Sequence, residues 1–103
     1  MIFIETPIFT DDLLRLLSDE EYAEFQAFLA LNPTSGDVIQ QTGGLRKIRW
    51  ASKGKGKRGG VRVIYYYLMA NSQIRLLLIY QKGIQDNLTD AQKKILRTIN
   101  ERW

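Results

Sequence analysis

Hydrophobic residues in the first third of the chain recur at the three- and four-residue spacing of amphipathic helices. A short strand at residues 2–5 precedes Thr6-Pro7, a pair typical of a helix N-cap and first helical position. A second helix is expected to begin at the capping box of residues 18–21 and to end at Asn32-Pro33. The apolar stripes of both helices predict packing against a core. These stripes contain Phe9, Leu13, Leu16, Leu17, Tyr22, Phe25, Phe28 and Leu29.

The remaining two thirds of the chain contain the pattern of strands and one further helix. Residues 34–44 form a polar connector, and Asn71-Ser72 has the composition of a tight turn. The last two predicted strands are apolar on both faces, as is typical of central strands, and we expect helices to cover one face of the sheet. The predicted strands cover residues 45–50, 61–69 and 74–80. A capping box at residues 89–92 begins a terminal helix whose inner side would be Leu88, Ala91, Ile95, Ile99 and Trp103.

The order β-α-α-β-β-β-α predicts a single α+β domain over residues 1–103. It would contain a small, twisted, mostly antiparallel sheet of about four strands, two N-terminal helices and one C-terminal helix. The apolar runs are much shorter than the roughly 20 residues that a membrane span needs, so we expect no membrane partner. The first residues lack the pattern of a signal peptide and the chain has no cysteine, which favours a cytoplasmic location.

Charge is divided very unevenly between the two halves. Residues 1–45 hold one basic and eight acidic residues, whereas residues 46–103 hold fourteen basic and three acidic ones, for a net charge of +4. Between Arg46 and Arg62 there are eight cations and no anion. Because such a segment attracts polyanions, the basic half is expected to bind nucleic acid. The chain has no histidine and no cysteine, which argues against a zinc site and leaves Lys, Arg, Tyr, Asp or Glu for acid–base catalysis.

The basic segment suggests a specific chemistry. Lys53, Lys55 and Lys57 alternate with glycines, so an extended backbone would point all three to one side. Arg62 is expected to be held against the sheet, and Lys82, after the last strand, could lie near it. Crowded ammonium groups lower a lysine pKa towards that of a general base, and arginine can stabilise charge on a pentacoordinate phosphorus. RNA could then be cleaved by attack of its own 2′-hydroxyl, without a metal or a cofactor. The alternative interpretation of the basic segment is a solvated loop that binds nucleic acid without cleaving it.

Several segments carry a resemblance to a known superfamily. They are residues 17–33, 36–67, 79–83 and 87–94, with GGLRKIRW, GKGKRGG and RVIYYY as the most specific block. On these segments the chain resembles the RelE/ParE toxin superfamily, and within it the HigB-like mRNA interferases of bacterial toxin–antitoxin pairs. The resemblance implies a twisted antiparallel sheet backed by helices and a ribosome-dependent endoribonuclease that cuts mRNA in the ribosomal A site. It also implies contact with rRNA and a HigA-like helix-turn-helix antitoxin, and we expect the free toxin to be a monomer.

The resemblance assigns roles to residues by position. The catalytic group would be Lys53, Lys55, Arg62 and Lys82. The basic segment and its surroundings add residues that would bind RNA or the ribosome, and these are Arg46, Lys47, Arg49, Lys57, Arg58 and Tyr80. Related chains often have Tyr-x-Lys-Asn/Ser-Glu where this chain has Tyr-Gln-Lys-Gly-Ile at residues 80–84, so a polar residue and a carboxylate of the family pattern are missing.

Two other functions stay open at this point. The superfamily also contains ParE-like toxins that poison gyrase without cutting RNA, and the chain could be an RNA- or ribosome-binding protein without catalytic chemistry. The lysine-rich segment and Arg62 favour the nuclease, because gyrase poisons generally lack such a cluster.

Overall fold

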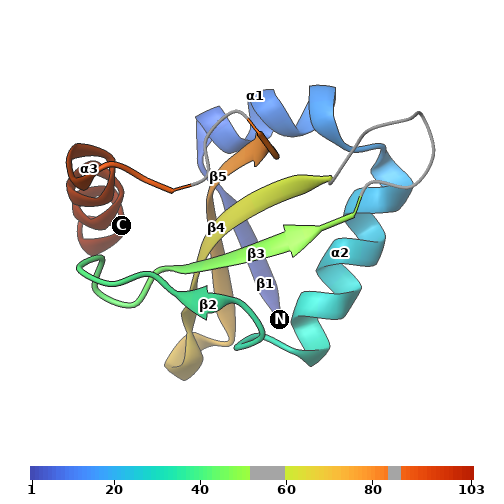
Figure 1. Cartoon of the computed structure of the whole chain (residues 1–103). Helices are drawn as coiled ribbons and strands as arrows, with labels where there is room; N and C mark the ends of the chain where they lie inside the picture. The colour runs from blue at the N-terminus through green and yellow to red at the C-terminus, as the bar shows by residue number, and fades with distance from the viewer. Residues whose placement is uncertain (52–59, 84–86) are drawn as a thin grey trace.

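The computed structural model describes residues 1–51, 60–83 and 87–103, which form three α-helices and one five-stranded sheet (Figure 1). The α+β class predicted from the sequence is therefore confirmed. No helix in these described ranges is long and apolar enough to cross a lipid bilayer. The elements are β1 (Ile2–Glu5), α1 (Pro7–Leu16), α2 (Asp19–Leu31), β2 (Asp37–Val38), β3 (Arg46–Trp50), β4 (Val61–Leu68), β5 (Gln73–Gln81) and α3 (Asp90–Glu101).

The sheet has the strand order β1-β5-β4-β3-β2. Strand β1 runs parallel to β5, whereas the other neighbouring strands are antiparallel, so the sheet is mixed. The sheet has five strands where about four were predicted, and three of its four strand pairings are antiparallel whereas the β1–β5 pair makes it mixed. The additional strand, β2, lies inside the segment predicted as a polar connector. With only two residues, it is too short for the alternation of apolar and polar side chains that identifies a strand.

The helix N-termini agree with the capping signals of the sequence. The Thr6 side chain accepts a hydrogen bond from the Phe9 amide, with Pro7 in the first turn. Helix α2 begins with a complete capping box formed by Ser18 and Glu21. A second complete box, formed by Thr89 and Gln92, begins α3. These bonds satisfy amide groups that have no partner within the helix, so local sequence alone fixes where each helix starts.

Helices cover both faces of the sheet, which corrects the expectation that they would cover one. Helices α1 and α2 pack over the larger core, in which Phe9 and Phe25 contact β4 and β5. Helix α3 lies on the other side (Figure 1), where Leu96 packs with Ile64 and Leu77 in a smaller core. Two separate apolar faces explain why the central strands are hydrophobic on both sides.

Helix α3 turns a different side to the sheet from the one predicted. The buried residues of this helix are Leu96 and Asn100. Arg75 of β5 donates to the backbone carbonyl and the side-chain oxygen of Asn100, both at 3.1 Å. The Arg75 guanidinium also lies 5.1 Å from the centre of the Trp103 ring. These contacts rotate the helix by about one residue, or roughly 100°. Of the five predicted inner residues, Leu88 is buried, whereas Ala91, Ile95 (59%), Ile99 (42%) and Trp103 (40%) are exposed.

Candidate anion-binding site

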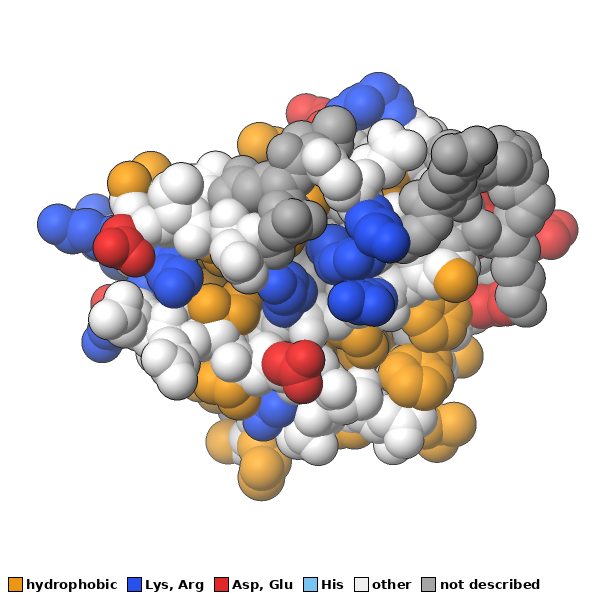
Figure 2. Space-filling model, in the orientation of Figure 1, with side chains coloured by type: hydrophobic (Ala, Val, Ile, Leu, Met, Phe, Trp, Pro, Cys, Tyr) orange, Lys and Arg blue, Asp and Glu red, His pale blue; other side chains and the backbone are white. Residues whose placement is uncertain are grey.

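The face of the sheet that carries α3 also carries a group of cations. The strand register places Arg49 of β3 directly opposite Arg62 of β4, and Arg62 opposite Tyr80 of β5. Because side chains alternate along a strand, Lys47 lies on the same side as Arg49, two residues away. Figure 2 shows Lys and Arg side chains gathered in the middle of this face. Pairing between strands therefore brings together cations that are distant in the sequence.

Arg49 and Arg62, here called the arginine pair, are two like charges directly opposed across β3 and β4. Directly opposed residues have Cβ atoms about 4.5–5.5 Å apart, and like charges at that distance destabilise a sheet. Arg62 is only 8% exposed, so water screens its charge less than that of the exposed Arg49. A bound anion would offset this repulsion, because it would place a negative charge beside both guanidinium groups.

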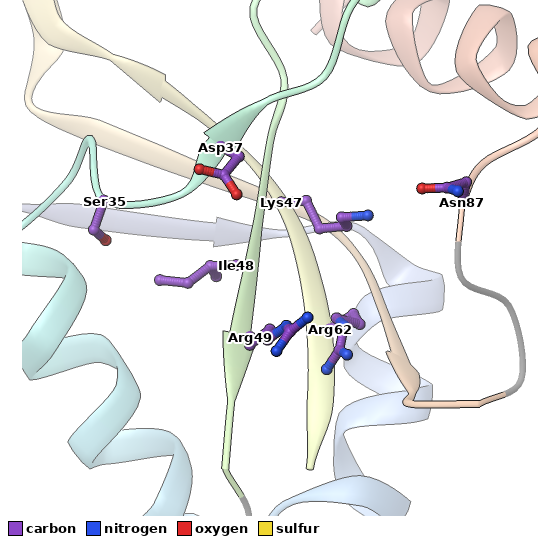
Figure 3. A pocket seen from close by; sticks show the side chains of 7 residues that line it. All are labelled: Ser35, Asp37, Lys47, Ile48, Arg49, Arg62 and Asn87. Atoms are coloured by element: carbon purple, nitrogen blue, oxygen red, sulfur yellow. The ribbon is translucent and has the colours of Figure 1, made fainter. Parts of the chain in front are cut away.

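A cavity of about 460 Å³ lies over the arginine pair. Figure 3 shows Arg49 and Arg62 side by side on neighbouring strands, with Lys47 extending towards Asn87. Guanidinium groups match the geometry of phosphate oxygens and can bind them in a bidentate manner. A cavity of this size and polarity therefore suits a charged group of the size of a nucleotide. The cavity is lined by Ser35, Asp37, Lys47, Ile48, Arg49, Arg62 and Asn87.

The wall of the cavity opposite β4 is held in place by buried and partly buried hydrogen bonds. The Tyr65 hydroxyl accepts from the Gly36 amide and donates to the Pro33 carbonyl, both at 2.9 Å. The Arg46 guanidinium donates to the Gly36 carbonyl at 2.8 Å. A Cβ atom at Gly36 would lie only 2.8 Å from the Tyr65 ring, so this close approach requires glycine. These contacts fix the backbone immediately before Asp37.

Three of the residues singled out from the sequence lie together in the cavity: Lys47, Arg49 and Arg62. The sequence assigned Lys47 and Arg49 to RNA binding and Arg62 to catalysis, whereas the structure places all three at one position. Arg46 lies apart from them, since it alternates with Lys47 along β3. Its guanidinium donates to the carbonyl oxygens of Thr34 and Gly36, and this contact supports the fold.

The remaining candidates are placed differently. Lys82 is exposed beyond the end of β5, and its backbone amide donates to the Gly60 carbonyl at 3.1 Å. Its neighbour two residues earlier, Tyr80, is adjacent to Arg62 in the sheet but lines a second cavity, of about 250 Å³, with Asp12 and Arg15 of α1. Four candidates lie outside the described residues: Lys53, Lys55, Lys57 and Arg58.

Sequence reasoning missed three polar residues of the cavity: Ser35, Asp37 and Asn87. Asp37 could have been noticed, because it is the one acidic residue between Asn32 and Arg62. Asn87 precedes the capping box of α3 and has no sequence pattern that links it to a site. Its position depends on where α3 docks, which is a tertiary property.

A clear pKa shift occurs at Tyr22 of α2, outside the cavity. Burial, and then the neighbouring Glu5 carboxylate, raises the pKa of Tyr22 well above the ordinary tyrosine value. The Tyr22 hydroxyl donates to one Glu5 oxygen at 2.6 Å, and the Thr10 hydroxyl donates to the other at 2.6 Å. This network joins β1 to both N-terminal helices, so its role is structural.

No family model matches the sequence. Within the described ranges, no three or more His, Cys, Asp or Glu side chains are grouped closely enough to hold a metal ion. The candidate site is therefore defined by its cations, its cavity and the polar residues around them.

Proposed function

We propose that this protein is an endoribonuclease that holds an RNA phosphodiester over the arginine pair. The observation that carries the proposal is the direct opposition of Arg49 and Arg62 on the floor of a polar cavity. Like charges directly opposed in a sheet repel each other, and the pair places two fork-shaped donors where a phosphate could accept from both. Together with the resemblance to HigB-like toxins, it supports a type II toxin that cuts mRNA on the ribosome and so inhibits translation.

The proposed reaction is a transesterification within the RNA chain. The 2′-oxygen attacks the adjacent phosphorus, so an O2′–P bond forms and the P–O5′ bond breaks. The products carry a 2′,3′-cyclic phosphate and a 5′-hydroxyl. Arg49 and Arg62 stabilise the extra negative charge on the non-bridging oxygens in the transition state. In this proposal one lysine takes the 2′-hydroxyl proton and a second one protonates the leaving oxygen. The candidates are Lys53, Lys55 and Lys82, which the resemblance marks as catalytic residues.

The partners follow from charge. The cationic face would contact mRNA and rRNA in the ribosomal A site, since phosphates dominate affinity for nucleic acid. A toxin must be covered when it is idle, and a HigA-like antitoxin could place acidic side chains against this face. Complementary charge would make that association fast and sensitive to salt. We propose that the free toxin is a cytoplasmic monomer.

Primer extension on a translated cellular mRNA after induction of the chain tests the proposal. Cuts within translated codons, absent with the Arg62→Met variant at equal expression, are expected. Intact message together with double-strand DNA breaks would instead identify a gyrase poison. Growth arrest with intact message and intact DNA would leave a non-catalytic binder of RNA or the ribosome.

The chemistry of the product ends provides a second test. The proposed mechanism predicts 5′-hydroxyl ends, which polynucleotide kinase can label directly, and 3′ ends that carry a cyclic phosphate or a 3′-phosphate. Products with 5′-phosphate ends would contradict attack by the 2′-hydroxyl.

A further inference from the structure

We propose that Asp37 selects a guanine base next to the phosphodiester held by the arginine pair. This inference rests on the proposed endoribonuclease function and adds a nucleotide preference to it. Among the described residues that line the cavity, Asp37 alone carries a carboxylate. A carboxylate repels phosphate and accepts hydrogen bonds only, so the part of an RNA that it can bind is one that carries donors. In RNA those donors are the bases and the ribose hydroxyls.

The side chain of Asp37 is exposed, but its backbone is held in the edge strand β2. It pairs with Lys47 across the β2–β3 ladder. The residue before it, Gly36, is fixed by Tyr65 and Arg46, and the Ile39 amide donates to the Leu45 carbonyl at 2.8 Å. The backbone is therefore anchored on both sides of Asp37. Recognition of a base edge needs this kind of fixed acceptor.

The distance between Asp37 and Arg62 indicates which part of a nucleotide the carboxylate would meet. The two residues are two strands apart and offset by two positions, which corresponds to about 12 Å between their Cβ atoms. Asp37 is nearer to Arg49, one strand away and offset by two positions, which corresponds to about 8 Å between Cβ atoms. A separation of roughly 8–12 Å from the pair is comparable with the span from a phosphate to the outer edge of its base. Asp37 is therefore placed to contact a base next to a phosphate held by the pair.

The donor pattern of the four RNA bases selects guanine. The Watson–Crick edge of guanine presents two adjacent donors, N1–H and the N2 amino group, which match the two oxygens of a carboxylate. Adenine and cytosine each place an acceptor beside their amino donor, and uracil flanks its N3–H with two carbonyl oxygens. These acceptors would face the negative charge of Asp37 without a hydrogen. Only guanine offers a bidentate match.

Binding of 2′-O-methyl dinucleotides to the purified chain tests the inference, because the methyl group blocks cleavage. We expect GpG to bind about tenfold more tightly than ApA, as one bidentate contact discriminates between bases by roughly 5- to 150-fold. Asp37→Ala should bring the ratio close to one. Asp37→Asn should move the preference towards ApA, since an amide offers one donor and one acceptor. Asp11→Asn, the same change at an exposed position of α1, should keep the wild-type ratio.

Equal affinities of the wild-type chain for the two dinucleotides would overturn the inference. An unchanged ratio of GpG to ApA affinity in the Asp37→Asn variant would also overturn it, provided that the melting temperature shows this variant to be folded. Cleavage of a reporter mRNA on ribosomes separates this result from the proposed function. Cutting that does not prefer guanine would reject the role of Asp37 while the nuclease stands. A guanine preference in binding with no cutting of any message would reject the nuclease and keep Asp37 as a base-recognition residue.

Discussion

Replacing Arg49 with glutamine should make the protein more stable and less active. The change removes one charge of the arginine pair, keeps most of the length of the side chain and leaves the buried Arg62 in place. Because Arg49 is exposed, its truncation costs little packing. The repulsion between opposed cations then disappears from the folded state, and the variant loses one of the two groups that would hold a phosphate.

The size of the gain follows from the cross-strand geometry. Directly opposed side chains in a sheet interact with about 0.2–1 kcal/mol, and like charges do so unfavourably. A domain of about 100 residues shifts its melting temperature by roughly 4–8 °C for each kcal/mol. Arg49→Gln should therefore raise the melting temperature by about 1–8 °C at low salt. In 1 M NaCl the gain should shrink, since the screening length falls to about 3 Å.

Thermal melts followed by circular dichroism at low and high salt would measure this gain. Lys94→Gln is the matched control, because it removes one positive charge from an exposed position of α3 that does not line the cavity. A melting temperature of Arg49→Gln at or below that of the wild type at low salt would refute the reasoning. An equal gain in Lys94→Gln would also refute it, because the effect would then come from net charge alone.

Three further predictions concern single side chains. Arg62→Met keeps the apolar stem of a buried residue and should lower RNA cleavage on ribosomes about 100-fold or more, and Arg62→Lys should lose less activity. Full activity of Arg62→Met would rule out a role of Arg62 in cleavage. Because the pKa of Tyr22 is raised, its protonated hydroxyl stabilises the fold fully below the ordinary tyrosine pKa of about 10, and this contribution is lost as the pH rises further. Tyr22→Phe should therefore melt below the wild type at pH 8, and the gap should narrow above pH 10; a constant gap would contradict the assignment. Arg75→Met removes two hydrogen bonds to Asn100 and the contact with Trp103. Amide hydrogen exchange should therefore accelerate along α3 and not along α1. Unchanged exchange in α3 would show that the smaller core alone anchors this helix.

The sequence predicted those parts of the fold that depend on local interactions. The helix starts at Thr6, Ser18 and Thr89 were correct, because a capping side chain bonds to an amide two or three residues away. Strand β2 and the orientation of α3 were not predicted. Both depend on partners distant in sequence, namely the pairing of Asp37 with Lys47 and the bond from Arg75 to Asn100. No local pattern contains those contacts.

The candidate site was predicted in part for the same reason. The charge of the segment that begins at Arg46 indicated an anion site, and the alternation on β4 placed Arg62 against the sheet. The register that opposes Arg49 to Arg62 could not be read from the sequence, since a shift of one residue along β4 would turn Arg62 to the other face. Asp37 and Asn87 enter the cavity only after β2 and α3 are in place.

Helix α3 contributes to the site through its position and not through its own side chains. The smaller core, anchored by Leu88 (9% exposed) and Leu96 (8% exposed), occupies one part of this face of the sheet. Asn87, the residue before Leu88, therefore reaches the cavity as its outer wall. The arginine pair is fixed independently by the β3–β4 ladder. Loosening α3 would thus move Asn87 while the β3–β4 ladder keeps both arginines in register, so under the proposed function phosphate binding and selection of the substrate would be altered separately.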